Sequence, residues 1–166
     1  MNNMSQFGKS TGTYSADYQD RIYAFTWLQN QGAGATTTKD HETQYADLKK
    51  ASDDTAAAAQ QAVDIIRRRG DRTQTDFPPI GAWIPHIYYT HLVLQDYLNA
   101  KLPDQLVICP EDKERAYWQS SAKDVSALNP YPSSNLTAGY KRWPYSSSYL
   151  HVDGDCPDRC RAGFTF

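Results

Sequence analysis

The chain has 166 residues, of which 40% are hydrophobic and 22% are charged, a composition typical of one folded domain. Its 17 basic and 19 acidic residues give a formal charge of -2, which excludes the concentrated positive surface that nucleic acids require. No apolar run is long enough to cross a membrane, and three cysteines are too few for a disulfide scaffold. We therefore expect a single domain over 1–166 that is soluble in the form given.

The first residues predict an amphipathic helix over 2–19, because apolar and aromatic side chains recur there every three or four positions. This stripe consists of Met4, Phe7, Thr11, Tyr14 and Tyr18, and we expect it to pack on the rest of the molecule. The next segment, 21–28, is aromatic and β-branched and favours an extended conformation. Residues 29–43 are small, polar and glycine-containing, which predicts a loop.

The central part of the chain predicts two helices. Residues 45–69 are rich in alanine and carry a stripe of mostly small residues, which predicts a helix that ends at Gly70 and packs closely on a neighbour. Three arginines, at 67–69, would favour the dipole at its end rather than bind a polyanion. Two prolines at 78 and 79 interrupt the pattern, and Pro85 suits the first turn of a second, largely apolar helix over 85–100.

Short apolar segments in the remaining chain predict a small sheet. The run "QLVIC" at 105–109 has the profile of an inner strand, and a second strand is expected over 145–152. Between them, 111–121 has acidic residues first and basic ones later, which favours a helix. The tail 153–166 has no periodicity. The expected fold class is α+β, with an N-terminal helix and further helices packed on a small antiparallel sheet.

The histidines do not form a recognisable catalytic group. His86 and His91 lie five positions apart on the predicted helix, about 140° around its axis, so they do not share a face as a metal-binding pair would. Each is expected to be a buried or partly buried, hydrogen-bonded side chain. His41 falls in the loop and His151 ends the last strand, and no residue is assigned to catalysis.

The tail offers three alternatives that the sequence leaves open. Asp153, Asp155 and Asp158 surround a glycine and could contribute oxygens to a calcium site, although the later bidentate glutamate of a calcium loop is missing. Cys156 and Cys160 could close a small disulfide loop in an oxidising compartment. The same two cysteines, with His151 and Cys109, could instead bind zinc.

Three segments resemble a known family. "NNMSQFGKSTGTYSADYQDRI", residues 2–22, with the Tyr-x-x-Asp turn at 14–17, is similar to the segment that follows the membrane helix in pseudopilin-like, prepilin-type proteins of type II secretion systems, especially those of planctomycetes. "VICPEDKERAYW" at 107–118 resembles the Cys-Pro-x-Asp block of their globular heads. "RWPYSSSYLHV" at 142–152 resembles their serine- and tyrosine-rich strand.

The resemblance implies a pilin-like head and a structural role. The chain would be a non-enzymatic subunit or assembly component of a type II secretion pseudopilus or related type IV pilus-like filament, and its partners would be other pilin-like subunits or secretion-system proteins. Family members begin with a basic leader, a cleavage site and an apolar helix. None of these precedes Met1, so we expect a truncated chain or an incomplete reading frame. The full-length parent would be periplasmic or at the cell surface, anchored in the inner membrane.

Two other classes of function remain open at this stage. One is a small metal-binding or hydrolytic domain that uses the Asp, Cys and His residues of the tail. The other is a module that binds carbohydrate or protein through exposed Trp118, Trp143 and Tyr145, although core packing is the commoner role of such aromatic residues. No cofactor other than calcium is expected.

Overall fold

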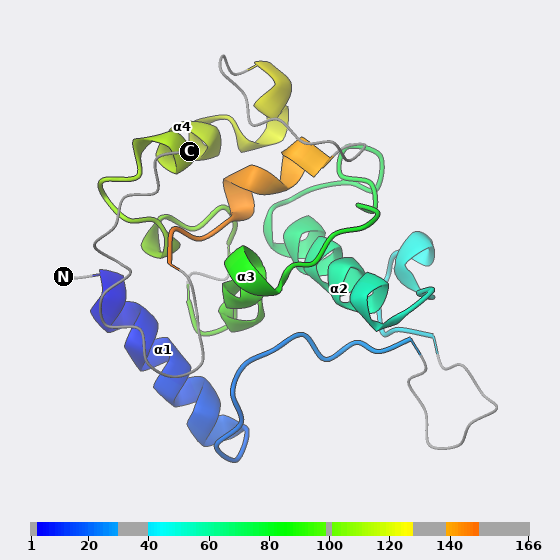
Figure 1. The fold of residues 1–166 in the computed structure, drawn as a ribbon, viewed down its shortest axis with the longest axis horizontal. Coiled ribbons are helices and arrows are strands. Elements are labelled where there is room, and N and C mark those ends of the chain that lie inside the picture. Colours follow the sequence, from blue (N-terminus) through cyan, green and yellow to red (C-terminus); the bar gives the residue numbers. More distant parts are fainter. Residues whose placement is uncertain (1–2, 30–39, 99–100, 128–138, 150–166) are drawn as a thin grey trace.

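The computed structural model describes residues 3–29, 40–98, 101–127 and 139–149, and the regular secondary structure in these ranges is helical (Figure 1). The α-helices are α1 (Asn3–Asp17), α2 (Asp54–Arg69), α3 (His86–Tyr89) and α4 (Lys113–Ser120). Short 3-10 helices connect them: η1 (Ala46–Leu48), η2 (Thr90–Leu94), η3 (Gln105–Val107), η4 (Ala122–Ala127) and η5 (Gly139–Tyr145). Helix α2 runs through the middle of the molecule and α1 lies along one edge (Figure 1).

The predicted α+β fold is wrong for the part of the chain that the structure describes, because no β-strand forms there. The apolar run at 105–109 begins as the 3-10 turn of η3 instead. The Asp104 carboxylate accepts a hydrogen bond from the backbone N–H of Leu106 at 2.9 Å and so stabilises this turn. A short apolar run is compatible with any buried segment, and here the local turn is the conformation that forms.

The second predicted strand, 145–152, is also absent from the described residues. Tyr145 ends η5, and 146–149 are irregular, while 150–152 lie outside the described ranges. Single hydrogen bonds hold this segment in place. The backbone N–H of Ser147 donates to the Tyr88 carbonyl at 2.8 Å, and that of Ser148 donates to the Val107 carbonyl at 3.0 Å. These bonds join three segments, but they do not form a ladder.

Helix α1 confirms the predicted N-terminal helix, but its buried stripe is narrower than expected. Phe7 and Tyr14 are 7% and 8% exposed, whereas Met4 and Tyr18, at the two ends of the stripe, are 47% and 50% exposed. The helix ends where residues 19 and 20 adopt φ values of 56° and 61°. This left-handed pair stops the α-helix and turns the chain back along it.

The segment after α1 is extended, as predicted, without pairing in a sheet. Tyr23 and Phe25 are buried while Ile22 is exposed, so alternate side chains face the core. The side-chain carbonyl of Gln61, on α2, accepts hydrogen bonds from the backbone N–H groups of Thr26 and Trp27 at 2.7 and 2.9 Å. One amide side chain of α2 therefore accepts backbone hydrogen bonds that the carbonyl groups of a neighbouring strand would otherwise accept.

The helix predicted over 45–69 is two elements, η1 and α2, separated by a break. Asp53 caps α2 because its carboxylate accepts a hydrogen bond from the backbone N–H of Ala56 at 2.8 Å. At the other end, Gly70 is required as predicted, since a Cβ there would lie 2.6 Å from the carbonyl oxygen of Ile66. The buried alanines of α2 allow neighbouring segments to approach its backbone closely.

Arg67, one of the three arginines expected to favour the dipole at the end of the helix, is a core residue. Its side chain is fully buried, and its two terminal nitrogens donate to the two carboxylate oxygens of Asp47 at 2.9 and 2.8 Å. Its Nε donates to the carbonyl of Phe77 at 2.9 Å, and its guanidinium lies 4.8 Å from the centre of the Tyr45 ring. These contacts satisfy a charge that would be costly to bury alone, and they tie η1 to α2.

The helix predicted over 85–100 is also broken. It begins after Pro85 as α3, tightens into η2 at Thr90, and its remaining described residues, 95–98, form turns. Helix α4 agrees with the helix predicted over 111–121, and Asp112 caps it by accepting from the backbone N–H of Arg115 at 3.1 Å.

Two large hydrophobic clusters form most of the core of the described residues, and a small third cluster joins Trp118 to Tyr140 and Trp143. The larger surrounds α2 and includes Ile66, Phe77, Trp83 and Leu92. The smaller joins α1 to η2 and η3 through Phe7, Tyr14, Tyr23, Leu94, Val107 and Ile108. Val93 packs against both clusters.

Candidate functional site

Apart from Cys109, the residues proposed for metal binding or a disulfide lie outside the described residues. These are Asp153, Asp155, Asp158, Cys156 and Cys160, together with His151. Among the residues that the structure does describe, no group of three or more His, Cys, Asp or Glu side chains could hold a metal ion. Cys109 is a free, half-buried thiol.

The two histidines of the predicted 85–100 helix occupy different environments. His86 is exposed at the start of α3, so the expectation that it is buried is wrong, and its ring makes an edge contact with Phe25 at 5.6 Å. His91 in η2 is buried as expected, but neither of its ring nitrogens has a hydrogen-bond partner. Burial lowers the pKa of His91 to about 3, against a smaller opposing effect of the Tyr88 backbone, so the ring is neutral near pH 7.

His41, which the sequence placed in a polar loop, is buried and links two segments of the chain by hydrogen bonds. Its two ring nitrogens lie 3.0 Å from the carbonyl oxygens of Leu48 and Leu28, and its ring stacks on Trp27 at 4.5 Å. The loop composition concealed this role, because the partners are backbone atoms distant in sequence.

The aromatic residues considered for an exposed binding surface are largely in the core. Trp118 is 8% exposed and Tyr145 is 1% exposed, while Trp143 is half-buried. The rings of Trp118 and Trp143 pack 5.6 Å apart. The interpretation of these three residues as surface-exposed ligand contacts is therefore wrong for Trp118 and Tyr145.

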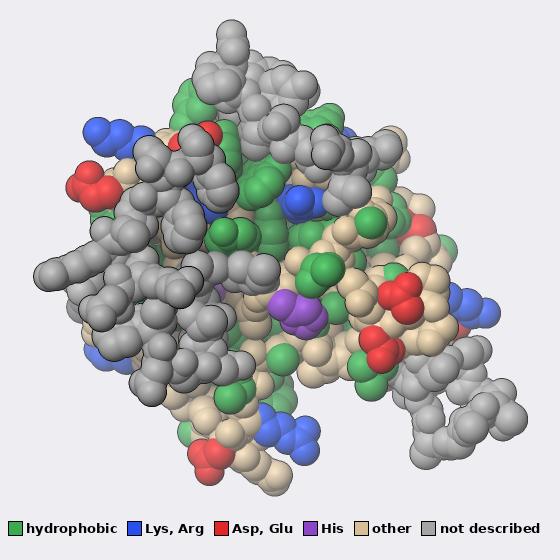
Figure 2. Space-filling model, viewed as in Figure 1, with side chains coloured by type: hydrophobic (Ala, Val, Ile, Leu, Met, Phe, Trp, Pro, Cys, Tyr) green, Lys and Arg blue, Asp and Glu red, His purple; other side chains and the backbone are tan. Residues whose placement is uncertain are grey.

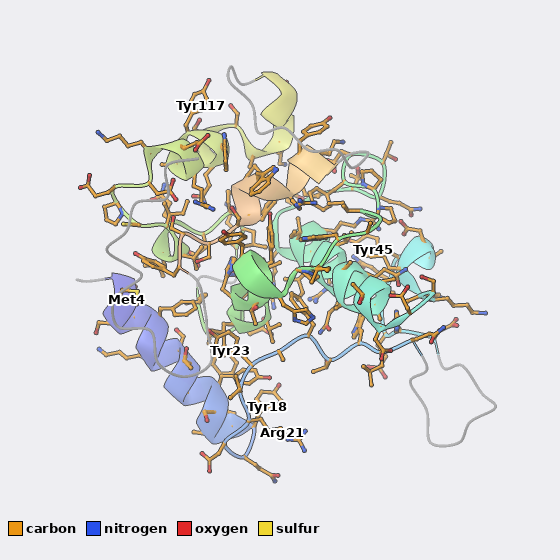
Figure 3. The ribbon with its side chains drawn as sticks, in the orientation of Figure 1. Met4, Tyr18, Arg21, Tyr23, Tyr45 and Tyr117 are labelled. Atoms are coloured by element: carbon orange, nitrogen blue, oxygen red, sulfur yellow. The ribbon has the colours of Figure 1, made fainter. Side chains whose placement is uncertain are left out.

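Helix α1 presents one face that is fixed on the body and one face that no described segment covers. On the fixed face, the hydroxyl of Ser10 donates to the Tyr97 carbonyl at 2.9 Å, and the Tyr97 hydroxyl donates to Asp17 at 2.8 Å. The hydrogen bond to Asp17 raises the pKa of Tyr97 to about 12. Figure 3 shows Met4 at one end of α1, Tyr18 and Arg21 at the other, and Tyr23 on the side of the helix that faces the body.

The uncovered face of α1 consists mainly of small residues. Its exposed positions are Ser5, Gly8, Lys9, Gly12, Thr13 and Ala16. A Cβ added at Gly8 or Gly12 would meet no atom of the described residues within 4 Å. Neither glycine is therefore required by the packing of the described residues, and each lowers the intrinsic stability of the helix.

A cavity of about 250 Å³ lies between α2 and η2. Its floor includes Ile65, Leu92 and Gln95, all of which are buried. Its rim carries exposed charged side chains, namely Glu42, Arg68 and Asp96, and Trp27 forms part of its wall. The segment 21–28, α2 and η2 thus contribute to the same hollow.

The polar groups of the cavity differ in how far the protein satisfies them. The buried Asp64 carboxylate accepts from the Thr43 hydroxyl at 2.6 Å and from Arg68 Nε at 2.7 Å. Arg69 pairs with Asp96. In contrast, the side chain of Gln95 is 2% exposed, and both its amide nitrogen and its amide oxygen lack a partner.

The visible surface charges are dispersed. Figure 2 shows acidic and basic side chains interspersed around the periphery of this face, without a patch of one sign. This distribution agrees with the near-neutral charge of the sequence. Within the described ranges, none of the helices combines the length and the hydrophobicity that crossing a bilayer requires.

Comparison with known proteins gives no relatives. No protein-family model, no curated protein and no solved structure matches this chain. Functional inference therefore depends on the residues and the geometry described above.

Proposed function

We propose that this chain is a non-enzymatic structural subunit that assembles with other pilin-like subunits through helix α1. The filament would be pilus-like and would lie in the periplasm or at the cell surface. The sequence resemblance points to the type II secretion pseudopilus as one such filament. The antiparallel sheet of a pilin head is not part of this proposal.

The two-faced packing of α1 carries the proposal. One face is held by Phe7 and Tyr14 and by hydrogen bonds to Tyr97, so the helix has a fixed orientation on the body. Helix α1 lies at one edge of the molecule (Figure 1). On its opposite face, Gly8 and Gly12 have no atom of the described residues within 4 Å of an added Cβ, so they offer close access to the helix backbone. Small residues allow two helices to approach closely, which favours helix-to-helix assembly.

The test is the self-association of the purified chain, measured by sedimentation equilibrium, for the native sequence and for Gly12→Leu. We expect the native chain to self-associate and Gly12→Leu to weaken this association at least ~10-fold, because a bulky side chain holds the helices apart. Stability should not fall, since leucine has the higher helix propensity by somewhat less than ~1 kcal/mol.

Thr55→Leu is the matched control, since it adds similar bulk at an exposed position of α2. We expect this variant to associate as the native chain does. A native chain that stays monomeric over the whole concentration range, or equal association of Gly12→Leu and the native chain, would contradict the proposal.

A further inference from the structure

Three tyrosine rings are in contact in series at the C-terminal end of α1. Tyr14 and Tyr18 lie one helical turn apart, and their rings stack with centres 4.5 Å apart at an angle of 22°. The ring of Tyr97, from the turn that follows η2, meets Tyr14 edge to face at 5.7 Å. Because each ring contacts the next, these side chains form a continuous path along which an electron can move.

The three rings differ in their contact with solvent. Tyr18 is 50% exposed, whereas Tyr14 is 8% exposed and Tyr97 is half-buried. Figure 3 shows Tyr18 beside Arg21 at the end of α1 that lies away from Met4. A bulky reagent in solution therefore reaches the Tyr18 ring most readily, and Tyr14 connects that ring to Tyr97.

Tyr97 is distinguished by the partner of its hydroxyl group. This hydroxyl donates to Asp17 Oδ2 at 2.8 Å. The hydrogen bond raises the pKa of Tyr97 to about 12, so the phenol keeps its proton near pH 7. Removal of an electron reverses this preference, because an oxidised phenol is a strong acid and a carboxylate beside it accepts the proton at once. Tyr97 thus has both an electron path and a proton acceptor.

Core packing explains the contacts between the rings, but it does not require a carboxylate at the Tyr97 hydroxyl. The hydrogen bond lies at the surface and joins residues 80 positions apart. Water can satisfy an exposed hydroxyl and an exposed carboxylate separately. The pairing of Tyr97 with Asp17, at the inner end of a path that starts at an exposed ring, is the feature that points to a chemical role.

We propose that Tyr97 is a site of one-electron oxidation, reached by an oxidant in solution through Tyr18 and Tyr14, with Asp17 as the proton acceptor. The oxidant is a one-electron acceptor of high potential, such as the ferryl haem of a peroxidase. The oxidation is independent of the assembly proposed for α1, because none of its residues is among the small residues of the uncovered face of that helix.

The electrons and the proton balance as follows from the geometry. One electron leaves the Tyr18 ring for the oxidant, an electron from Tyr14 replaces it, and an electron from Tyr97 replaces that of Tyr14. The Tyr97 proton moves to Asp17 Oδ2, while Tyr14 and Tyr18 keep their own protons. The phenol and the carboxylate become a neutral phenoxyl radical and a carboxylic acid, and one equivalent of oxidant is reduced.

The experiment oxidises the full chain with photogenerated tris(bipyridine)ruthenium(III), a bulky one-electron oxidant, in the presence of the spin trap nitroso-tert-butane. A tyrosyl radical adds to this trap through a ring carbon, and mass spectrometry of proteolytic peptides gives the share of adduct at each tyrosine. We expect the largest share at Tyr97, ahead of Tyr18 and of Tyr117, which is 41% exposed in α4. Shares that simply follow exposure, with Tyr18 and Tyr117 ahead of Tyr97, would overturn the proposal.

The variants test the proton acceptor and the electron path separately. Asp17→Asn keeps an acceptor oxygen for the hydroxyl but cannot take its proton, so the adduct at Tyr97 should fall at least ~10-fold. Tyr14→Phe and Tyr18→Phe keep the ring shapes but are harder to oxidise, and each should also lower it. Tyr117→Phe is the control and should leave it unchanged. An undiminished Tyr97 adduct in Asp17→Asn, or in both path variants, would overturn the proposal.

Discussion

Individual residues carry several roles that the sequence pattern could not show. The sequence predicts only that Arg67 favours the helix dipole, and the structure shows that it is buried and pairs with Asp47. Its burial could have been predicted from the sequence, since it lies four residues after the buried Val63 and therefore on the same face of α2. The identity of its partner could not have been predicted, because Asp47 belongs to a separate 3-10 turn whose orientation depends on tertiary packing.

Gln95 and His41 also have environments that depend on tertiary packing and that the sequence alone does not reveal. Gln95 lies four positions after His91 in a segment that is apolar on most faces, so it could have been suspected of burial. That its amide lacks partners follows only from the arrangement of α2 and η2 around the cavity. The ring nitrogens of His41 contact two backbone carbonyl groups, and no pattern of residue types in the sequence predicts backbone partners of this kind.

The buried His91 should make the stability of the protein depend on pH. Burial lowers its pKa from 6.5 to about 3 in the folded chain. Below pH 6.5 the unfolded ring binds a proton that the folded ring does not bind, so acid favours the unfolded state. This contribution to stability is fully present above pH 6.5 and is lost as the pH falls toward about 3. At most, it changes the free energy of unfolding by ~1.4 kcal/mol per pH unit.

Urea unfolding between pH 4 and pH 7 measures this dependence. We expect His91→Leu to have a flatter pH profile than the native chain, by up to one proton, and His86→Leu to retain the native slope because His86 is exposed. Equal slopes for the native chain and His91→Leu would show that the ring is charged, or becomes solvated, in the folded state. Neither substitution is expected to abolish a catalytic turnover.

At the scale of elements, the sequence was informative about helices and misleading about strands. Helix α1, helix α4 and the end of α2 were predicted because each has periodicity or a local end signal, such as Gly70 after the arginines. The runs at 105–109 and near 145 were assigned to strands because they are short, apolar and bounded by turns. Such runs become strands only if a partner strand is adjacent, and in the described residues α1 packs beside η3 instead.

The docking of α1 should depend on two aromatic residues. Phe7 and Tyr14 are 7% and 8% exposed, and both make edge-to-face contacts with the Tyr23 ring, at 6.3 and 6.1 Å. Replacing either with alanine removes a buried ring and leaves a space that the surroundings fill only in part. We expect Phe7→Ala to lower the free energy of unfolding by ~3 kcal/mol, and Tyr14→Ala by a similar amount.

Met4→Ala is the control for this prediction, because Met4 lies on the same helix but is 47% exposed. Its effect should stay within about 0.5 kcal/mol. Chemical denaturation of the three variants gives the comparison directly. If Phe7→Ala were as stable as Met4→Ala, α1 would not be docked through this face.

At the scale of the whole molecule, the two large hydrophobic clusters divide most of the described core into parts of unequal size. The larger cluster surrounds α2 and recruits segments from Phe25 to Tyr145, whereas the smaller joins α1 to η2 and η3. Val93 packs against both, so the clusters touch without merging. This division was not visible in the sequence, because the smaller cluster depends on contacts between residues about ninety positions apart.

The division predicts that α1 opens without unfolding α2. Native-state hydrogen exchange should give a lower opening free energy for the backbone amides near Tyr14 than for those near Val63, because α1 is held by fewer buried side chains and no described segment covers its outer face. Phe7→Ala should lower protection in α1 more than in α2. Val63→Ala, in the larger cluster, should lower protection in both helices, since α2 exchanges only when the whole molecule unfolds.

Identical opening free energies for α1 and α2 in the native chain would mean that the two clusters unfold as one cooperative unit. In that case α1 could not rearrange in an assembly without loss of the fold.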